Sequence, residues 1–541
     1  MSLQKTIDCV VIGYNAIDYD QFSVHQKEMY TGNAHEVKTN SLLFNGQRML
    51  YMDLLNHAVE QATGYNPKLN VFNTQSMGAC YLQSYLQDRD FTVEVVNFFN
   101  RDKDKLSLLL AESPLAVAIT TTFYVDHLPI MEIVKFIRER NPETTIIVGG
   151  PHIYNVCSDL DEPSQDYIFR QIGADIYVND SQGETTLSQL LYRLKHAQAI
   201  DGVPNLIYFN DDERVSCRTV REPERNDMDD TSIHWETFAP ELLTPMTYMR
   251  TARSCPFACS FCNYPTQAGA HVLSSLETIE REFDALYKAG TEMIVFTDDT
   301  FNVPLPRFKK MMQLMIDKQY GFKWVSFLRC SNLDEHALDL MAESGCVGVF
   351  LGVESGDAEM LRKMNKNAKP ERYKWGMQGL HERGIATYTS LICGFPGETE
   401  ETIKNTIAFV EETAPTFYTI QLYYHNRHTP IHAQADEIGL KGGGYNWHHN
   451  TMSWREAADW SIYMYKTIQN SIPIPSFEFS MWGIAYLVAQ GFTVEQIKQF
   501  GRIAQEAFIP SLDDIAIDCT DQERRLVELF KDVSFGDVLE F

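Results

Sequence analysis

"MTYMRTARSCPFACSFCNYP" occupies residues 246–265 and joins a short apolar run to three closely spaced cysteines. The run 246–253 predicts a β-strand, and Cys255, Cys259 and Cys262 follow it at spacings of four and three residues. The whole chain has 11 cysteines, so three in one short loop form an unusual concentration. Thiolates gathered in this way are ligands for a soft metal centre.

The number of cysteines in the loop narrows the kind of centre. Zinc normally takes four Cys or His ligands, and the loop offers three, with His271 some way beyond it. A four-iron cluster held by three cysteines keeps one iron open for a substrate or cofactor. We therefore predict a 4Fe–4S cluster on Cys255, Cys259 and Cys262. Zinc binding and a chance grouping stay open as alternatives.

Six strand-like runs separated by helical patterns begin with the strand that precedes the cysteines. They lie at residues 246–253, 291–299, 323–330, 347–355, 386–394 and 417–425. Repeated units of this kind predict a partial (β/α)6 TIM-like barrel over residues 240–440. In such barrels the chemistry lies at the carboxyl ends of the strands, where the cysteine loop is placed.

The first part of the chain alternates strand and helix in a second series. Runs rich in β-branched residues at 9–15, 92–100, 115–123, 144–152 and 174–180 alternate with helical patterns such as 126–140 and 183–195. This pattern predicts an α/β, doubly wound (Rossmann-like) domain over residues 1–225, with ligands at the carboxyl ends of its parallel strands. A hairpin turning at Asp211–Asp212 closes it, and residues 221–232 are predicted to be a linker. Residues 441–541 are predicted to form a helical C-terminal domain.

Composition excludes several classes of function. The net charge is −27, which disfavours binding to nucleic acid phosphates or anionic lipid. No apolar run is long enough to span a membrane. The other cysteines are scattered, as in a reduced protein without a disulfide framework, which predicts a cytoplasmic location.

The loop "CPFACSFC" resembles the CxxxCxxC signature of the radical S-adenosylmethionine (radical SAM) superfamily. The resemblance implies that the open iron of the cluster chelates SAM. It also implies that one electron, from a donor such as flavodoxin or ferredoxin, cleaves SAM to a 5′-deoxyadenosyl radical that abstracts hydrogen. An intact signature argues against a non-catalytic peptide-binding scaffold.

Other strand ends fit the same resemblance. "LGVESG" (351–356) closes the fourth strand, and Glu354 and Ser355 are candidates to bind the ribose or methionine part of SAM. Arg329, at the end of the third strand, is a candidate for the SAM carboxylate, with a structural ion pair as its alternative role.

"CGFPGETEE" (393–401) closes the fifth strand, and Gly394 and Gly397 let the backbone approach a ligand closely. Following the cysteine motif, it is a candidate loop for the adenine side of SAM. A plain strand-to-helix turn capped by Thr399 is the alternative.

The front domain resembles the cobalamin-binding subclass of these enzymes in residues 149–155 and 173–191. The D-x-H-x-x-G motif that supplies an axial histidine is absent, because Asp126–His127 has the wrong spacing. Many cobalamin-dependent radical SAM methylases also lack this motif, so its absence does not decide. Cobalamin binding stays possible but is not favoured under the epimerase prediction that follows.

All three regions, with "YNWHHNTMSW" (445–454), resemble a branch that contains phosphinate P-methylases and epimerases of proteusin-type precursor peptides. We predict a peptide epimerase that converts L- to D-residues in a ribosomally made precursor peptide. A cobalamin-dependent radical SAM C- or P-methyltransferase is the alternative. An epimerase needs a thiol to return hydrogen, and Cys393 is the candidate, with Cys330 in reserve and a buried core cysteine as the plain alternative.

Overall fold

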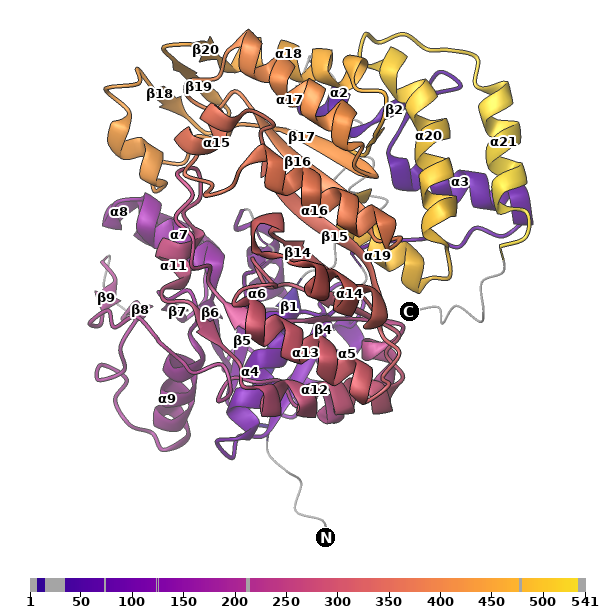
Figure 1. Ribbon diagram of the computed structural model, residues 1–541. Coiled ribbons are helices and arrows are strands. Elements are labelled where there is room, and N and C mark those ends of the chain that lie inside the picture. Colours follow the sequence, from indigo (N-terminus) through magenta and orange to yellow (C-terminus); the bar gives the residue numbers. More distant parts are fainter. Residues whose placement is uncertain are drawn as a thin grey trace. The chain divides into compact units, whose positions relative to one another are not determined.

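The computed structural model describes residues 7–14, 35–72, 74–122, 124, 126–210, 215–475 and 479–533. These residues divide into two compact units. We call residues 7–14, 74–242 and 274–285 the front unit, and residues 35–72, 243–273 and 286–533 the barrel unit, with the gaps just given. Each unit is built around its own sheet (Figure 1). The predicted boundaries at residues 225, 240 and 440 stay predictions.

The front unit contains a seven-stranded sheet in the order β4-β1-β5-β6-β7-β8-β9. Its strands are β1 (Cys9–Tyr14), β4 (Val93–Phe98), β5 (Ala116–Thr120), β6 (Thr145–Gly149), β7 (Ile176–Val178), β8 (Leu206–Tyr208) and β9 (Cys217–Arg218). The first five strands in that order pair in parallel, and β8 and β9 close the sheet antiparallel. The doubly wound prediction is confirmed. The hairpin turn at Asp211–Asp212 lies outside the described residues.

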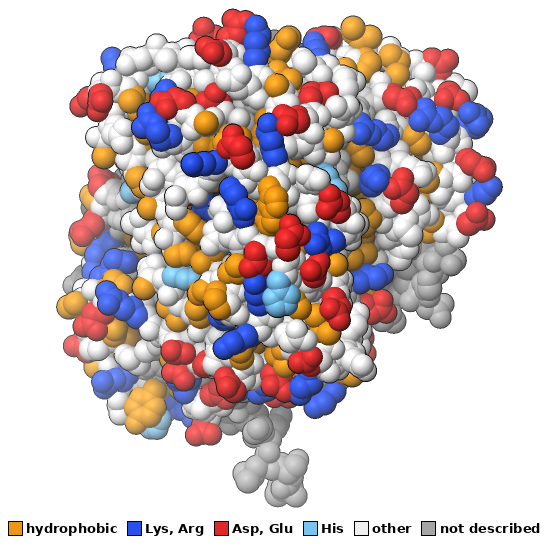
Figure 2. Space-filling view, in the orientation of Figure 1, with side chains coloured by type: hydrophobic (Ala, Val, Ile, Leu, Met, Phe, Trp, Pro, Cys, Tyr) orange, Lys and Arg blue, Asp and Glu red, His pale blue; other side chains and the backbone are white. Residues whose placement is uncertain are grey.

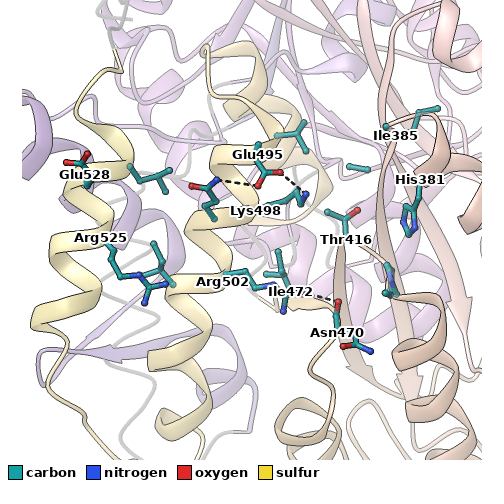
Figure 3. A pocket seen from close by; sticks show the side chains of 18 of the residues that line it. His381, Ile385, Thr416, Asn470, Ile472, Glu495, Lys498, Arg502, Arg525 and Glu528 are labelled. Atoms are coloured by element: carbon teal, nitrogen blue, oxygen red, sulfur yellow. Dashed lines mark hydrogen bonds and ion pairs between the residues drawn. The ribbon is translucent and has the colours of Figure 1, made fainter.

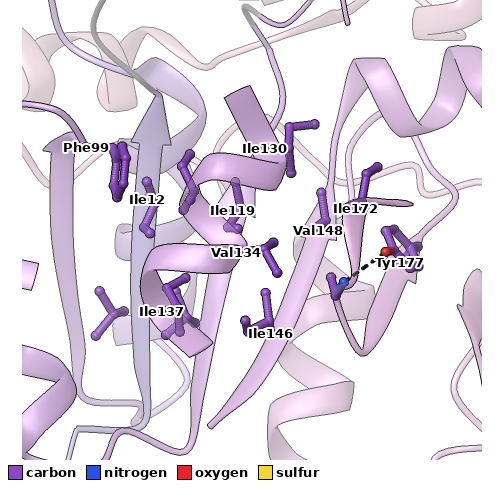
Figure 4. Packing of buried hydrophobic residues seen from close by; sticks show 14 of the residues in the cluster. Ile12, Phe99, Ile119, Ile130, Val134, Ile137, Ile146, Val148, Ile172 and Tyr177 are labelled. Carbon is purple, nitrogen blue, oxygen red and sulfur yellow. Dashed lines mark hydrogen bonds between the residues drawn. The ribbon is translucent and has the colours of Figure 1, made fainter. Parts of the chain in front are cut away.

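Helices cover both faces of the front sheet because its strands are apolar on both sides. The helices are α4 (Met77–Gln87), α5 (Lys103–Ala111), α6 (Leu128–Arg140), α7 (Pro151–Asp159), α8 (Glu162–Ile172) and α9 (Glu184–Lys195). Val10 and Ile12 of β1 pack into one buried cluster with α5 to α8, which Figure 4 shows around Ile137. Cys9 and Val11 point to the other face and join α4 and α9.

Short elements complete the front unit. After β9 the chain forms the 3-10 helix η2 (Trp235–Thr237), and the division between the units falls within α10 (Pro240–Leu243) and α12 (Leu276–Ala289). The buried carboxylate of Glu282 on α12 accepts hydrogen bonds from the Trp235 indole (3.1 Å) and the Ile233 amide (3.3 Å). These bonds hold the segment before the barrel against α12.

The barrel unit contains a second seven-stranded parallel sheet, in the order β10-β13-β14-β15-β16-β17-β21. Its strands are β10 (Met246–Met249), β13 (Met293–Phe296), β14 (Lys323–Leu328), β15 (Cys346–Glu354), β16 (Ala386–Cys393), β17 (Phe417–Leu422) and β21 (Ile472–Pro473). Neighbours in the first six positions are consecutive in the chain, as in a (β/α) barrel, and all pairs are parallel. The predicted partial barrel is confirmed. Cys346, predicted to precede its strand, is the first residue of β15.

Helices and short hairpins surround this sheet. The helices are α11 (Tyr264–Ala268), α13 (Leu305–Asp317), α14 (Glu335–Glu343), α15 (Ala358–Lys363), α16 (Pro370–Glu382), α17 (Glu400–Thr413), α18 (Trp454–Thr467), α19 (Met481–Ala489), α20 (Val494–Ser511) and α21 (Thr520–Phe530). The hairpin elements are β11 (Ala252–Arg253), β12 (Val272–Leu273), β18 (Lys441–Gly443), β19 (Asn446–His449) and β20 (Met452–Ser453), with the 3-10 helices η3 (Cys330–Asn332) and η4 (Pro430–Gln434). Capping boxes start α18 at Ser453 and α20 at Thr493, so the C-terminal region is helical as predicted.

An early part of the chain also belongs to the barrel unit. It contains α2 (His35–Asn40), β2 (Leu42–Phe44), β3 (Gln47–Met49) and α3 (Tyr51–Thr63). Tyr51 is fully buried against Phe500 and Phe508 of α20, and Arg48 pairs with Asp514 at 3.1 Å. The sequence patterns do not reveal this long-range packing, because local periodicity says nothing about which neighbour a helix contacts.

Among the described residues, we find no helix with the length and apolar character needed to cross a membrane. Acidic and basic side chains alternate over the face of the molecule in Figure 2.

Candidate functional site

The three clustered cysteines lie in the loop between β11 and α11, just beyond the carboxyl end of β10. Cys259 is buried, and Cys255 and Cys262 are half-buried. The Cys262 amide donates a hydrogen bond to the Cys259 carbonyl at 3.1 Å. Burial raises the pKa of the Cys262 thiol, and the neighbouring Cys259 and Cys255 thiols raise it further. This mutual effect places the three thiols around one small volume.

Zinc normally takes four Cys or His ligands, and the cysteine loop offers three thiols. His271, beyond the loop, faces a cation, since burial and then Arg307 lower its pKa. A four-iron cluster needs only three cysteines, because its fourth iron binds a substrate or cofactor. The donor set therefore fits a cluster.

Backbone and side-chain hydrogen bonds hold the cysteine loop to the segment after α15. Ser260 donates from its amide to the Met364 carbonyl (2.9 Å) and from its hydroxyl to the Lys363 carbonyl (3.0 Å). The Asn365 side-chain amide donates to the Ala258 carbonyl at 2.6 Å. The loop is thus fixed at the residues on both sides of Cys259.

Arg329 follows β14 and lies against the cysteine loop. Its guanidinium carbon is 3.6 Å from the centre of the Phe257 ring, and one of its terminal nitrogens donates to the Lys366 carbonyl. The side chain is buried, yet its Nε has no hydrogen-bond partner among the described residues. A buried donor without an acceptor is costly, so this atom is suited to a ligand carboxylate.

Glu354 and Ser355 lie at the carboxyl end of β15, as predicted. Glu354 has a left-handed backbone conformation (φ 66°) and its carboxylate pairs with Lys366 at 2.7 Å, both side chains being 9% exposed. Such a conformation is uncommon outside glycine and is often found at functional sites. The Ser355 hydroxyl instead lies 3.0 Å from Thr406 Oγ1, inside the protein.

The loop after β16 turns at two glycines with positive φ, Gly394 (91°) and Gly397 (90°). A Cβ atom at Gly394 would lie 2.5 Å from the Trp447 ring, so only glycine fits there. The amide of Gly394 donates to the buried Glu398 carboxylate, and burial raises the pKa of Glu398 to about 8. Thr399 caps α17, as the plain alternative predicted, so the loop combines a helix cap with a close backbone approach.

Both the candidate thiol, Cys393, and the reserve thiol, Cys330, are buried. Cys393 is buried, and its thiol donates to the Ala457 carbonyl of α18 at 3.4 Å. Burial raises its pKa well above the ordinary value. Cys330 begins η3 and faces α16, where a Cβ at Gly376 would lie 2.7 Å from its sulfur. A catalytic role for Cys393 stays a prediction.

The sequence analysis missed two acids after β13. Asp298 is buried and accepts hydrogen bonds from the Thr251 amide (3.0 Å) and hydroxyl (2.8 Å), which fixes the start of the cysteine loop. Burial raises the pKa of Asp299 to about 6, and Tyr264, which follows the cysteines, hydrogen-bonds to it. The run "TDDTFN" at a strand end was the available signal.

The carboxyl edge of the front sheet carries glycine and hydroxyl groups, with Arg101 stacked on Phe98 at the end of β4. A Cβ atom at Gly13, near the end of β1, would lie 2.6 Å from Ser76. The Thr121 hydroxyl donates to the Gly149 carbonyl (2.9 Å) and accepts from the His152 amide (3.1 Å). His152 Nε2 is buried with no partner among the described residues, and burial lowers the pKa of this histidine. This edge includes the switch point between β1 and β5, where doubly wound sheets bind ligands.

A cleft of about 1,090 Å³ lies elsewhere in the barrel unit, beside the amino ends of β16 and β17 (Figure 3). Its cations are already bonded: Lys498 to Glu495 (2.7 Å), Arg525 to Glu506 (2.8 Å), and Arg502 to backbone carbonyls such as that of Asn470 (3.0 Å). It is at the opposite ends of the strands from the cysteine loop, so it is not the candidate site.

Two family models match the two halves of this architecture. Residues 249–410 match the Radical SAM superfamily, and residues 71–178 match the B12 binding domain. The chain combines a B12-binding domain with a radical SAM domain. The first match contains the cysteine loop and the ends of β13 to β16, and the second contains β4 to β7 of the front sheet.

Curated relatives are named as methyltransferases, methylthiotransferases and a cyclase. The anaerobic magnesium-protoporphyrin IX monomethyl ester cyclase of Rubrivivax gelatinosus is 24% identical over 367 residues, covering 63% of this chain and 63% of the relative. An uncharacterised methyltransferase of Pyrococcus horikoshii is 24% identical over 395 residues, covering 70% of this chain and 81% of the relative. The ribosomal protein uS12 methylthiotransferase RimO of Cytophaga hutchinsonii is 28% identical over 211 residues, covering 36% of this chain and 48% of the relative. The chain therefore spans about half of that methylthiotransferase.

Two solved structures share the fold. The radical SAM methyltransferase TsrM of Kitasatospora setae, with cobalamin and a 4Fe–4S cluster bound, superposes with a TM-score of 0.58 at 16% identity, over 84% of this chain and 96% of its own. The cobalamin-dependent radical SAM enzyme OxsB, with aqua-cobalamin bound, gives 0.60 at 14% identity, over 97% of this chain and 84% of its own.

These similarities correct two predictions. The expected peptide epimerase is wrong, because the curated relatives are named as methyltransferases, methylthiotransferases and a cyclase, and the methyltransferase names fit the alternative prediction better. The view that cobalamin is not favoured is also wrong, because the front unit contains a B12-binding domain.

Proposed function

We propose that the protein is a cobalamin-dependent radical SAM methyltransferase. The observation that carries this proposal is the presence of two ligand-binding edges in one chain. One is a cysteine loop at the carboxyl edge of the barrel sheet, and the other is the edge of a B12-binding domain. The names of the curated relatives support the same activity.

Cys255, Cys259 and Cys262 would hold the cluster. The loop excludes water with aromatic side chains, since Phe257 lies under Arg329 and the Phe261 ring meets Phe395 edge-on at 6.4 Å. Its hydrogen bonds to residues 363–366 keep it in place, which favours a cluster held at fixed orientation.

SAM would be held at the ends of β14, β15 and β16. The unpartnered Nε of Arg329 is available to a carboxylate, and the Glu354 carboxylate, which pairs with Lys366, would meet the ligand's amino group. The turn at Gly394 and Gly397 would lie on the adenine side. The Ser355 hydroxyl contacts Thr406 inside the protein. Ser355 would therefore act indirectly, by holding the turn after β15 in place.

Cobalamin would be held at the carboxyl edge of the front sheet. At this edge Gly13 packs against Ser76 and Thr121 bonds to the Gly149 carbonyl, while His152 Nε2 offers a buried, unpartnered nitrogen. When bound, the cluster and SAM supply radical chemistry, and cobalamin supplies methyl-group transfer. The chain's own residues then bind and orient these groups and exclude water.

The precursor peptide predicted from the sequence remains a proposal for the substrate. The test of the function needs no substrate. Anaerobically reconstituted protein with added hydroxocobalamin and a reductant should convert SAM to S-adenosylhomocysteine, which methyl transfer to a corrinoid requires. The Cys255/Cys259/Cys262→Ala variant should lose SAM radical cleavage but keep its corrinoid. Formation of 5′-deoxyadenosine with no S-adenosylhomocysteine, with or without corrinoid, would overturn the methyltransferase assignment.

A further inference from the structure

Residues 361–375, "LRKMNKNAKPERYKW", form a basic segment in an acidic protein. The segment contains six basic residues and one acidic residue, whereas the whole chain has a net charge of −27. It includes the end of α15 and the start of α16 (Figure 1). Arg362, Lys363 and Lys369 are exposed to solvent.

This basic segment also contacts the cysteine loop. Its residues Lys363, Met364 and Asn365 make the hydrogen bonds to Ala258 and Ser260 that were described above. Ala258 and Ser260 are the residues on either side of Cys259. The exposed cations therefore lie one hydrogen bond away from the residues adjoining a predicted cluster ligand.

The charge of the segment is only partly neutralised. Arg362 pairs with Glu359 at 2.5 Å, but both side chains are at least half exposed, and exposed pairs of this kind contribute little. Among the described residues, no carboxylate forms an ion pair with Lys363 or Lys369, and Lys363 donates to the Gly397 carbonyl at 3.2 Å. Lys366 and Lys374 also form ion pairs, with Glu354 and Glu412. Lys363 and Lys369 therefore keep charges with which no carboxylate of the described residues pairs.

We propose that the basic segment is the docking surface for an acidic, one-electron-carrying protein such as a flavodoxin. This inference rests on the proposed function, which requires the cluster to be reduced. The reduced donor loses one electron and the cluster gains it, with no bond made or broken. Because electron transfer weakens steeply with distance, the donor must dock where the cluster loop meets the surface. Opposite charges raise the rate of such encounters.

The test is the charge-reversal variant Arg362→Glu/Lys369→Glu. Neither side chain contacts the predicted SAM or cluster ligands. Cluster reduction is followed by its absorbance in anaerobic stopped-flow, with reduced flavodoxin at low ionic strength. We expect reduction to slow about tenfold and to lose most of its dependence on salt. Reduction by dithionite, which is small and needs no docking surface, should keep the wild-type rate, which also shows that the variant is folded and loaded.

The matched control is Lys404→Glu/Arg524→Glu. Both residues are exposed and hold similar local ion pairs, with Glu400 and Asp521, and the charge change is the same. This variant should accept electrons from flavodoxin at the wild-type rate. Equal rates for both variants, or an equal loss in both, would overturn the docking surface alone. A wild-type protein that binds no cluster would overturn the proposed function together with it.

Discussion

The carboxyl edge of the front sheet is built from glycine and hydroxyl groups, with Arg101 beside β4, whereas that of the barrel sheet carries thiols and a buried ion pair. At the front edge, Gly13 packs closely against Ser76, and Thr121 bonds to the Gly149 carbonyl. The barrel edge instead holds Arg329 and Glu354 against the cysteine loop. Both sheets are parallel and both present their strand ends to ligands, so the fold sets where binding happens and the side chains set which ligand is bound.

The difference also concerns stability. The two charges of a buried ion pair such as Glu354–Lys366 compensate each other only while both side chains are present. An edge built from glycine and hydroxyl groups has no such dependence, and it is sensitive to added volume instead. The following variants test these two kinds of edge separately.

The largest effect is expected for the cysteine loop. Changing Cys255, Cys259 and Cys262 together to Ala should abolish iron binding and SAM cleavage, because no other thiol lies beside the loop. The bound corrinoid should be unaffected, since the front edge contains none of these residues. Iron analysis and product chromatography check this. Iron retained at the wild-type level would show that the cluster is held elsewhere.

Breaking the buried pair at the barrel edge should cost stability as well as SAM affinity. Glu354→Gln leaves the Lys366 charge buried without its partner, which typically costs about 3–5 kcal/mol. The double variant Glu354→Gln/Lys366→Met should regain much of that stability but not the affinity for SAM. Anaerobic urea unfolding and SAM-binding titration separate the two effects. A single variant as stable as the double one would contradict the pair's role.

The variant Gly13→Ala tests the front edge, because it adds a methyl group where the packing is tight. In Gly13→Ala the new Cβ would meet Ser76 at 2.6 Å and the Asn97 carbonyl oxygen at 2.7 Å. Overpacking of this kind costs about 1–3 kcal/mol, and corrinoid retention should fall while iron content does not. Gly202→Ala is the control, because its nearest atom is 4.0 Å away. Equal corrinoid content in the two variants would place cobalamin away from this edge.

The pH dependence of stability tests the loop after β16. Burial raises the pKa of Glu398 from an ordinary 4.5 to about 8, so the folded state binds a proton that the unfolded state releases. The stability that protonated Glu398 contributes to the folded state is full below pH 4.5 and is lost as the pH rises to about 8. Glu398→Gln keeps an acceptor for the Gly394 amide and should remove this part of the decline. The free energy of unfolding of both proteins is measured at pH 5 and pH 8. Equal declines in the two proteins would contradict this role of Glu398.

The smallest effect is expected for Cys393. Its thiol is buried against α18, so Cys393→Ala should lower the free energy of unfolding by about 1 kcal/mol. A methyltransferase needs no thiol to return hydrogen, so S-adenosylhomocysteine formation should persist at the wild-type rate. A folded variant that still cleaves SAM but forms no methyl-transfer product would give the thiol a catalytic role.

Local patterns in the sequence were sufficient for both sheets and for the cysteine loop. Strand runs ending in Gly, Asn or Asp fixed the strand positions, and the spacing of Cys255, Cys259 and Cys262 identified the cluster. They could not reveal that Tyr51 packs on α20, that Glu398 is buried, or that Lys366 pairs with Glu354. Each of these depends on contacts between residues distant in sequence.

The functional error had a different cause. The choice of epimerase over methyltransferase depended on a single cysteine, Cys393. One thiol cannot decide between two chemistries that share the same cluster and fold. The B12-binding match over residues 71–178 carried the information that a single residue could not.

The most direct test of the central claim is native mass spectrometry of the chain after anaerobic reconstitution with iron, sulfide and hydroxocobalamin. We predict one species whose mass includes both a 4Fe–4S cluster and a corrinoid, with the cluster lost in the triple cysteine variant and the corrinoid reduced in Gly13→Ala. A chain that carries the cluster but never the corrinoid would contradict the account of two cofactor-binding edges.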